Sequence, residues 1–440
     1  MNLPPGARAL GQWLLLGSVV GGVCGVASAV FLALLERATD FRLGHEAWVY
    51  ALPVAGLVVG AVYGRWGASI RGGNNLVLDT VHEGDAVLPL RMAPMVLLGT
   101  VLTHLFGGSA GREGTAVQMG ASLADQVAHR FGVTRDTRRE LLAAGIAGGF
   151  GSVFGTPLAG TVFGMEVVCV GRLGYEALLP ALTAAVVGDL VTRGLGIHHT
   201  VYPSPQALAL TLPVLGKWLV FAAGVALVAV AFIEGTHGLK KLLERRVPWL
   251  PLRMALGGLG VVGLWQLSGT NEYLGLGVPG ILRAFHDVSL PWGAFAWKFV
   301  FTAVTLGAGF LGGEVTPLFF IGASLGNVLA RLLGLPVDLG AAVGMAALFA
   351  AASNTPLALS LMAVELVGAA VLPHVAIVAT VAYLLTGHRG IYPSQRIARR
   401  KLGGPLLERM VSLRELHETP RKPGAPRQGV SDIPPGSGRG

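Results

Sequence analysis

Residues 107–126, GGSAGREGTAVQMGASLADQ, combine a glycine-rich turn, two adjacent charges and the start of an apolar run. The two charges are Arg112 and Glu113, and the surrounding sequence is apolar enough to lie in a membrane. A charged break in a bilayer is costly unless it faces a protein cavity or a water path. We therefore interpret Arg112 and Glu113 as part of a functional site.

The pattern recurs in the second half of the chain. Residues 313–326, GEVTPLFFIGASLG, repeat the glycines and the GASL motif of residues 111–123. A second matched pair follows each copy, TPLAGTVFGME at 156–166 and TPLALSLMAVE at 355–365. Two matched blocks in the same order indicate an internal duplication. Interrupted apolar segments at corresponding places in two halves point to a binding site near the middle of a membrane.

Composition supports a polytopic membrane protein. Of 440 residues, 52% are hydrophobic and 13% are charged, with a mean hydropathy of +0.63. The formal charge of +9 comes from Lys and Arg in loops and in the C-terminal tail, as expected for cytoplasmic segments, so we infer no nucleic-acid partner. Cys24 and Cys169 have no His or carboxylate at ligand spacing, so we expect neither a metal site nor a cofactor.

Several apolar segments are shorter than the roughly 20 residues that span a bilayer, which predicts tilted, re-entrant or broken helices. We expect a membrane domain over residues 1–395, with repeat one at about 48–193 and repeat two at about 252–386. Residues 396–440 are expected to form a basic cytoplasmic tail that is disordered after about residue 417. Both termini are expected on the cytoplasmic side.

Four polar or glycine-broken stretches interrupt the apolar background, at residues 71–79, 107–115, 312–317 and 387–393. Three of them place small residues directly before an apolar run, as at the start of a half-helix. Helix N-termini expose unpaired N–H groups and a positive dipole end, so several that converge form an anion site. Glycines in one such stretch could equally serve close helix packing, but the internal repeat favours the anion site.

These residues resemble the CLC family of chloride channels and proton-coupled anion antiporters. The resemblance covers about residues 10–395 and rests on GREG at 111–114, G-x-x-x-P at 313–317, the two TPLA blocks and Tyr392. It implies an all-α homodimer in the cell inner membrane, with an inverted-topology repeat whose broken, re-entrant helices meet at a midplane anion site. It also implies that Glu113 is the gating glutamate, which competes with the anion and carries the proton, and that Tyr392 contacts the anion.

The chain departs from the chloride-type pattern at four places. It has Gly73-Asn74-Asn75-Leu76-Val77 for G-S-G-I-P, Thr115 for the proline after GREG, Glu314-Val315-Thr316 inside G-x-F-x-P, and Val167 where antiporters have a second carboxylate. Together these changes resemble the fluoride-transporting branch of the family, in which a glutamate and a threonine of the second repeat line the pathway.

On this basis we predict Glu113 and Glu314 as gating or proton-coupling residues. The predicted anion-binding residues are Asn74, Asn75, Arg112, Gly114, Thr115, Val315, Thr316 and Tyr392. Fluoride is small, strongly hydrated and a better hydrogen-bond acceptor than chloride. Amide, hydroxyl, phenol and backbone N–H donors are groups that could replace its water.

We expect the protein to be a transporter and not an enzyme. Its expected function is to export fluoride in exchange for protons, which would confer fluoride resistance. The alternative is a chloride/proton exchanger or a chloride channel. A membrane-embedded hydrolase would need paired acids or a Ser/His or HExxH constellation, and the apolar segments contain none. A receptor or scaffold gives no reason for repeated charged half-helix starts.

Some polar residues have a simpler structural interpretation. Glu166 and Glu365 end matched apolar segments, where a hydrogen bond within the bundle is the favoured role. His104 is favoured as a core histidine with its hydrogen bonds satisfied rather than a proton relay, and Arg112 could pair with a buried acid.

Overall fold

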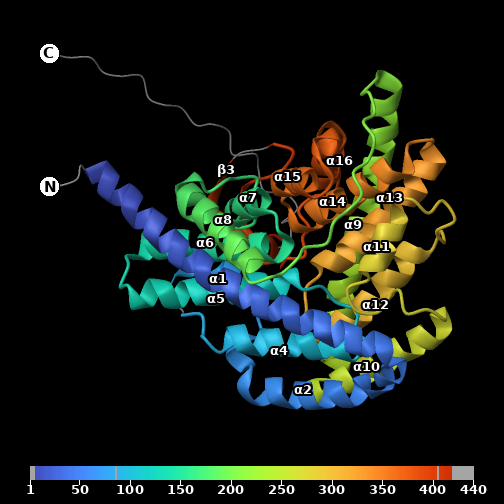
Figure 1. The fold of residues 1–440 in the computed structure, drawn as a ribbon, viewed down its shortest axis with the longest axis horizontal. Helices are drawn as coiled ribbons and strands as arrows, with labels where there is room; N and C mark the ends of the chain where they lie inside the picture. Colours follow the sequence, from blue (N-terminus) through green and yellow to red (C-terminus); the bar gives the residue numbers. More distant parts are fainter. Residues whose placement is uncertain (1–4, 85–86, 404–405, 419–440) are drawn as a thin grey trace, which may run out of the picture.

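The computed structural model describes residues 5–84, 87–403 and 406–418, which are mostly helical, as predicted (Figure 1). The first half contains α1 (Pro5–Gly44), α2 (Leu52–Trp66), α3 (Asn74–Glu83), α4 (Met92–Leu105), α5 (Glu113–Arg130), α6 (Arg135–Phe154), α7 (Pro157–Glu166) and α8 (Leu178–Gly194). The second half contains α9 (Leu212–Arg246), α10 (Leu250–Ser268), α11 (Val278–Ala284), α12 (Ala294–Ala308), α13 (Val315–Leu333), α14 (Val337–Ser353), α15 (Pro356–Val367) and α16 (Leu372–Leu385). Short 3-10 helices cover Glu46–Ala51, Ala68–Ile70, Tyr175–Ala177 and Ala369–Val371.

Six helical segments in the described part of the chain are long and apolar enough to cross a membrane. Other apolar helices are too short for this, including α4, α12 and α15. Broken helices of this kind are tolerated in a membrane where protein surrounds them. Short apolar helices are therefore present, as the short apolar segments of the sequence predicted.

The two halves pack in matching ways. Helix α1 packs against α6 and α8, and α9 packs against α14 and α16 in the same manner. The long helices α1 and α9 thus lead the two halves, ahead of the repeat starts expected near residues 48 and 252. In Figure 1, α2 and α10 lie together at the lower edge of the molecule, and they are in contact.

Two small-residue helices form the centre of the fold. All residues from Leu141 to Phe154 in α6 and from Leu339 to Ser353 in α14 are buried. The repeated glycines let α5 and α13 approach these helices closely. A Cβ on Gly120 would lie 2.2 Å from the Gly145 carbonyl oxygen, and one on Gly322 would lie 2.3 Å from the Gly344 carbonyl oxygen. Backbone-to-backbone crossings of this kind are typical of membrane helices.

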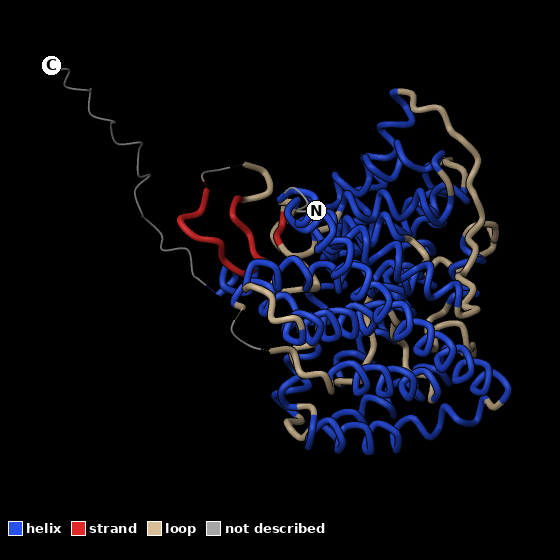
Figure 2. Tube along the Cα trace, turned by 60° about the vertical axis from the view of Figure 1, so that its left-hand side comes forward, coloured by secondary structure: helices blue, strands red, loops and turns tan. Residues whose placement is uncertain are grey.

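Two strands that follow α16 form a small sheet with a strand that precedes α8, and the sequence analysis did not predict this sheet. Strand β1 (Cys169–Val170) pairs in parallel with β2 (Arg396–Arg399), which pairs in antiparallel with β3 (Leu406–Ser412). Figure 2 shows these strands at the edge of the helical body, and α17 (Leu413–Glu418) follows them. The predicted disorder after about residue 417 falls almost entirely on residues 419–440, which lie outside the described residues.

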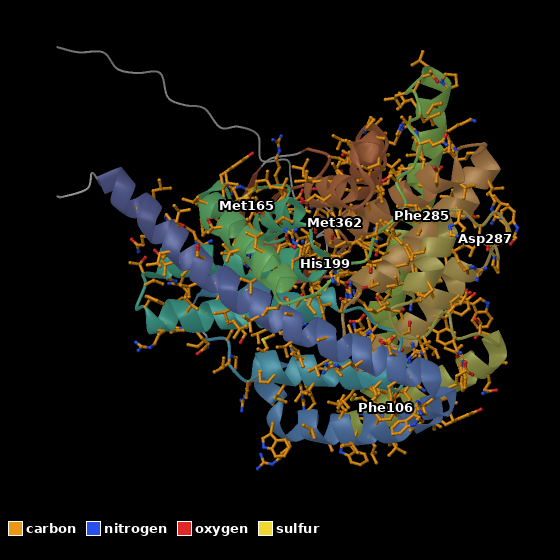
Figure 3. All side chains as sticks on the ribbon, viewed as in Figure 1. Phe106, Met165, His199, Phe285, Asp287 and Met362 are labelled. Atoms are coloured by element: carbon orange, nitrogen blue, oxygen red, sulfur yellow. The ribbon has the colours of Figure 1, made fainter. Side chains whose placement is uncertain are left out.

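The segment between the two halves runs over the surface. His199 belongs to this segment and lies over the middle of the face shown in Figure 3. Its Nε2 atom is 3.5 Å from Oδ1 of Asp189 on α8. Farther along, the backbone nitrogen of Gln206 donates to Asp338 at the start of α14. The connection is thus fastened to both halves.

Candidate anion site

The starts of α5 and α13 are joined by a two-residue antiparallel bridge. The nitrogen of Gly111 donates to the Gly313 carbonyl at 2.6 Å, and the nitrogen of Gly313 donates to the Gly111 carbonyl at 2.8 Å. A Cβ on Gly111 would lie 3.0 Å from both the Gly313 oxygen and Cδ of Pro317. Glycine is therefore needed for the close approach, and the two repeated motifs meet across a pseudo-twofold axis.

Glu113 is fully buried at this junction. Both of its carboxylate oxygens are 2.6 Å from the Thr316 hydroxyl, and one accepts the Thr316 backbone N–H at 3.2 Å. The Arg112 backbone N–H donates at 3.1 Å, and the Arg112 guanidinium lies 3.4 Å away. The carboxylate thus lies in the first turn of α13, where a helix N-terminus favours negative charge. It occupies the kind of position that a free anion would take.

A third helix start, that of α3, reaches the same place. Gly73 precedes it with φ of +55°, and Nδ2 of Asn74 lies 3.0 Å from the position a Cβ on Gly114 would take. The same Gly114 position is 3.9 Å from a carboxylate oxygen of Glu314. The residues that precede α3, α5 and α13 make no side-chain cap. Three helix starts without such caps therefore converge around Gly114.

A cavity of about 840 Å³, called here the vestibule, leads to this point. The predicted site residues that line it are Asn74, Asn75, Thr115, Glu314 and Tyr392. The charged residues that line it farther out are Arg65, Arg71, Lys240, Glu244 and Arg253. Electropositive walls raise the local concentration of anions. The vestibule thus offers a route for an anion to the junction of the three helices.

Tyr392 lies on a loop that is fixed from two sides. The Ile391 N–H donates to the Ala352 carbonyl at 2.9 Å. The Ser394 N–H donates to the side-chain oxygen of Asn75, and its hydroxyl donates to Asp79, both at 3.0 Å. Asn75 therefore positions the loop that carries Tyr392, in addition to lining the vestibule.

Five predicted site residues do not line the vestibule: Arg112, Glu113, Gly114, Val315 and Thr316. Arg112 and Thr316 contact the Glu113 carboxylate instead. Val315 is buried and presents an apolar side chain, so only its backbone could contact an anion. The predicted set is therefore split between the vestibule and the buried surroundings of Glu113.

Other polar residues have structural partners. Glu166 accepts the N–H groups of Leu357 and Ala358, and Glu365 accepts those of Leu158 and Ala159. Each carboxylate thus caps the partner half-helix, as the favoured structural interpretation expected. Both ring nitrogens of His104 contact carbonyl oxygens, those of Thr100 and Ala110.

Two vestibule residues were missed in the sequence. Thr100 and Gln118 line the cavity near Asn74 and Thr115. Gln118 follows Gly114 by one helical turn, so its place on the same face of α5 was available from helix periodicity. Thr100 lies in the same apolar run as Thr103, and nothing in the sequence distinguished the two.

The sequence matches a known family and named relatives. A family model described as "Voltage gated chloride channel" matches residues 55–387. A "Chloride/fluoride channel protein" of Pseudomonas syringae pv. tomato is 46% identical over 418 residues, which cover 93% of this chain and 92% of the relative. A "Voltage-gated ClC-type chloride channel ClcB" of Salmonella typhi is 32% identical over 318 residues, which cover 67% of this chain and 73% of the relative.

Solved structures give the same picture. The crystal structure of a CLC-type fluoride/proton antiporter has a TM-score of 0.86 and 37% identity, covering 90% of this chain and 100% of that chain. A slow cyanobacterial Cl−/H+ antiporter has a TM-score of 0.75 and 21% identity, covering 88% and 95%. These likenesses confirm the expected helical fold with its inverted repeat.

Proposed function

This chain belongs to the voltage-gated chloride channel (CLC) family of membrane transport proteins, and from that premise we propose that it exports fluoride in exchange for protons. The observation that carries the proposal is the position of the Glu113 carboxylate in the first turn of α13, held by Thr316. An ionised carboxylate and a free anion compete for the same donors there. Protonation of Glu113 weakens its hold and lets the anion replace it.

The vestibule supports a role for fluoride as the anion. Donors that face it or lie at its inner end include the Asn74 amide, the Thr115 hydroxyl and the Tyr392 phenol. Fluoride loses a large hydration energy on entry, and numerous short hydrogen bonds compensate for this loss better than a few long ones. The likeness to a CLC-type fluoride/proton antiporter and to a chloride/fluoride channel protein supports the same choice.

Glu314 is proposed as the second proton-coupling residue. It lines the vestibule, and its carboxylate is near Gly114, across the glycine bridge from Glu113. A carboxylate in this place can exchange protons with vestibule water. A proton passed between Glu314 and Glu113 would cross the same narrow junction as the anion.

We also propose a homodimer in the inner membrane with both termini in the cytoplasm. Helices α7 and α15 contact each other and expose large apolar side chains, including Leu158 and Leu357. The basic residues at the outer end of the vestibule, such as Lys240 and Arg253, are consistent with a cytoplasmic opening. Crosslinking of the purified protein in lipid tests the dimer.

The proposed function is tested with purified protein in liposomes loaded with fluoride or chloride. Ion-selective electrodes record the efflux of each halide, with and without an imposed pH gradient. We expect fluoride efflux to exceed chloride efflux and to respond to the pH gradient. Equal rates for the two halides would instead favour the chloride exchanger or channel.

A further inference from the structure

The hydroxyl group of Thr100 is arranged unlike those of most other threonines in the helices. The Thr103 hydroxyl donates to the Gly99 carbonyl, four residues earlier in the same helix, at 2.9 Å. Thr305 and Thr386 follow the same pattern. Thr100 instead faces the neighbouring helix, where its Oγ1 atom lies 2.7 Å from Oγ1 of Thr115. The side chain is fully buried.

The two hydroxyls together leave one donor unused. Each carries one hydrogen, and only one of the two can lie between the oxygens. Among the described residues, neither Thr100 nor Thr115 has another side-chain hydrogen bond. One O–H group of the pair is therefore left without a protein acceptor.

Both threonines line the vestibule, so an anion in that cavity would be close to the pair. Thr115 follows Gly114 directly, and a Cβ on Gly114 would lie 3.0 Å from the Asn74 amide nitrogen and 3.9 Å from a Glu314 carboxylate oxygen. The pair thus faces the space where an anion would meet the starts of α3 and α5. A hydrogen bond from the Thr100 hydroxyl to the Thr115 oxygen leaves the Thr115 hydrogen available to an anion in this space.

From this geometry we infer that Thr100 is a specificity-determining residue of the anion path, acting with Thr115 as a two-hydroxyl donor that favours fluoride over chloride. The inference rests on the proposed function. A hydroxyl that itself accepts a hydrogen bond is a stronger donor, because bonds in a chain polarise one another. Fluoride, as the stronger acceptor, gains more from this donor than chloride does.

The test replaces Thr100 by valine, which keeps the shape and removes the hydroxyl. Fluoride efflux from proteoliposomes is measured over a range of fluoride concentrations, with chloride as a competitor. We expect the KM for fluoride to rise about three- to tenfold, with chloride inhibition unchanged, because a charged hydrogen bond is weakened. Thr100→Ser keeps the hydroxyl and should restore the wild-type KM.

Thr103→Val is the matched control, since Thr103 is buried in the same helix but does not line the vestibule. It should keep the wild-type KM. Thr115→Val and the double variant complete a cycle, in which a shared donor predicts a double variant no worse than about the poorer single variant. If Thr100→Val does not fold, the KM for fluoride is measured in Thr100→Ala and Thr115→Val instead, again with chloride as a competitor.

Several outcomes overturn the inference. A wild-type fluoride KM and halide preference in Thr100→Val would show that Thr100 does not act on the anion. Strictly additive effects in the cycle would show that the two hydroxyls do not act as one donor. If the wild-type protein transports chloride but no fluoride, the proposed function fails and this inference fails with it. If wild type transports fluoride and only the Thr100 result is negative, the proposed function stands.

Discussion

Glu113 depends on one residue from each repeat for its hydrogen bonds. Arg112 belongs to the first repeated motif and Thr316 to the second, and both donate to the carboxylate. An anion that replaced the carboxylate would meet the same hydroxyl and the same backbone N–H of Thr316. We therefore expect one small group of donors to bind two alternating occupants, the Glu113 carboxylate and the anion.

Glu113→Gln keeps the size of the side chain but removes its ability to bind and release a proton. We expect proton movement during fluoride efflux to fall to the level of empty liposomes. A pH electrode placed beside the fluoride electrode measures both fluxes at once. Proton flux in the wild-type ratio to fluoride would show that another group carries the proton.

Thr316→Ala removes a donor that lies 2.6 Å from the carboxylate oxygens. A hydrogen bond to a charged group contributes about 1.5–3 kcal/mol, so fluoride efflux should slow by roughly ten- to a hundredfold. Thr316→Ser is the control and should retain most of the rate. Wild-type efflux in the alanine variant would remove Thr316 from the pathway.

The sequence identified part of this site. The charged break and its repeat singled out Glu113, and the resemblance to the fluoride-transporting branch of the family indicated Glu314 and Thr316. Their roles stay predictions. The local sequence does not determine where a side chain in the first turn of a helix points. The hydrogen bond that Asn75 accepts from Ser394, in the loop that carries Tyr392, was therefore not predicted. Thr100 was missed because the hydroxyl of a threonine in an apolar helix usually donates to a carbonyl of its own helix.

At the scale of elements, the crossings of α5 with α6 and of α13 with α14 hold the half-helix starts in place. Each crossing brings one backbone onto another at a repeated glycine, Gly120 or Gly322. The repeated GASL motif already matched Gly120 with Gly322 in the sequence. The partners Gly145 and Gly344 were not evident, because glycine is frequent throughout the chain.

Gly120→Ala should destabilise the protein by about 2–3 kcal/mol, since the new Cβ would lie 2.2 Å from the Gly145 carbonyl oxygen and must push the helices apart. Thermal unfolding in detergent measures the change as a lower Tm. Gly263→Ala is the control, because a Cβ at Gly263 has nothing within 4 Å. Equal Tm values for the two variants would contradict the close crossing.

Lys401 fastens the segment between β2 and β3 to the helical body. Its Nζ lies 2.6 Å from the Asn354 side-chain oxygen, 2.7 Å from the Tyr383 carbonyl and 3.8 Å from the centre of the Tyr383 ring. Burial lowers the pKa of Lys401 to about 7, whereas an unfolded lysine has a pKa of about 10.4. The sequence showed only a basic tail here, because strands this short are recognisable only through their partners.

The lowered pKa of Lys401 fixes the direction of a pH effect. Between pH about 7 and about 10 the unfolded chain binds more protons, so the free energy of unfolding rises with pH. Below pH about 7 the cost of burying the charge is present in full. Lys401→Met should remove this contribution. The Tm of the wild-type protein minus the Tm of the variant should therefore increase from pH 7 to 10. Parallel Tm profiles over this range would contradict the prediction.

At the scale of the whole molecule, two related halves place three helix starts around one point. The duplication and the short apolar segments predicted this arrangement, and the likeness to CLC structures confirms the fold. The course of the segment between the halves could not be predicted, since its contacts with Asp189 and Asp338 join residues far apart in sequence. The paired caps of Glu166 and Glu365 extend the twofold arrangement to α7 and α15.

The most direct test of the central claim is whether a fluoride gradient alone can move protons. Proteoliposomes loaded with fluoride are diluted into fluoride-free buffer at the same pH, with the membrane voltage held at zero by potassium and valinomycin, and interior pH is recorded. If fluoride and the Glu113 proton take turns at the starts of α5 and α13, the interior acidifies as fluoride leaves, and Glu113→Gln abolishes the acidification. Fluoride efflux through the wild-type protein with no change in interior pH would contradict the account.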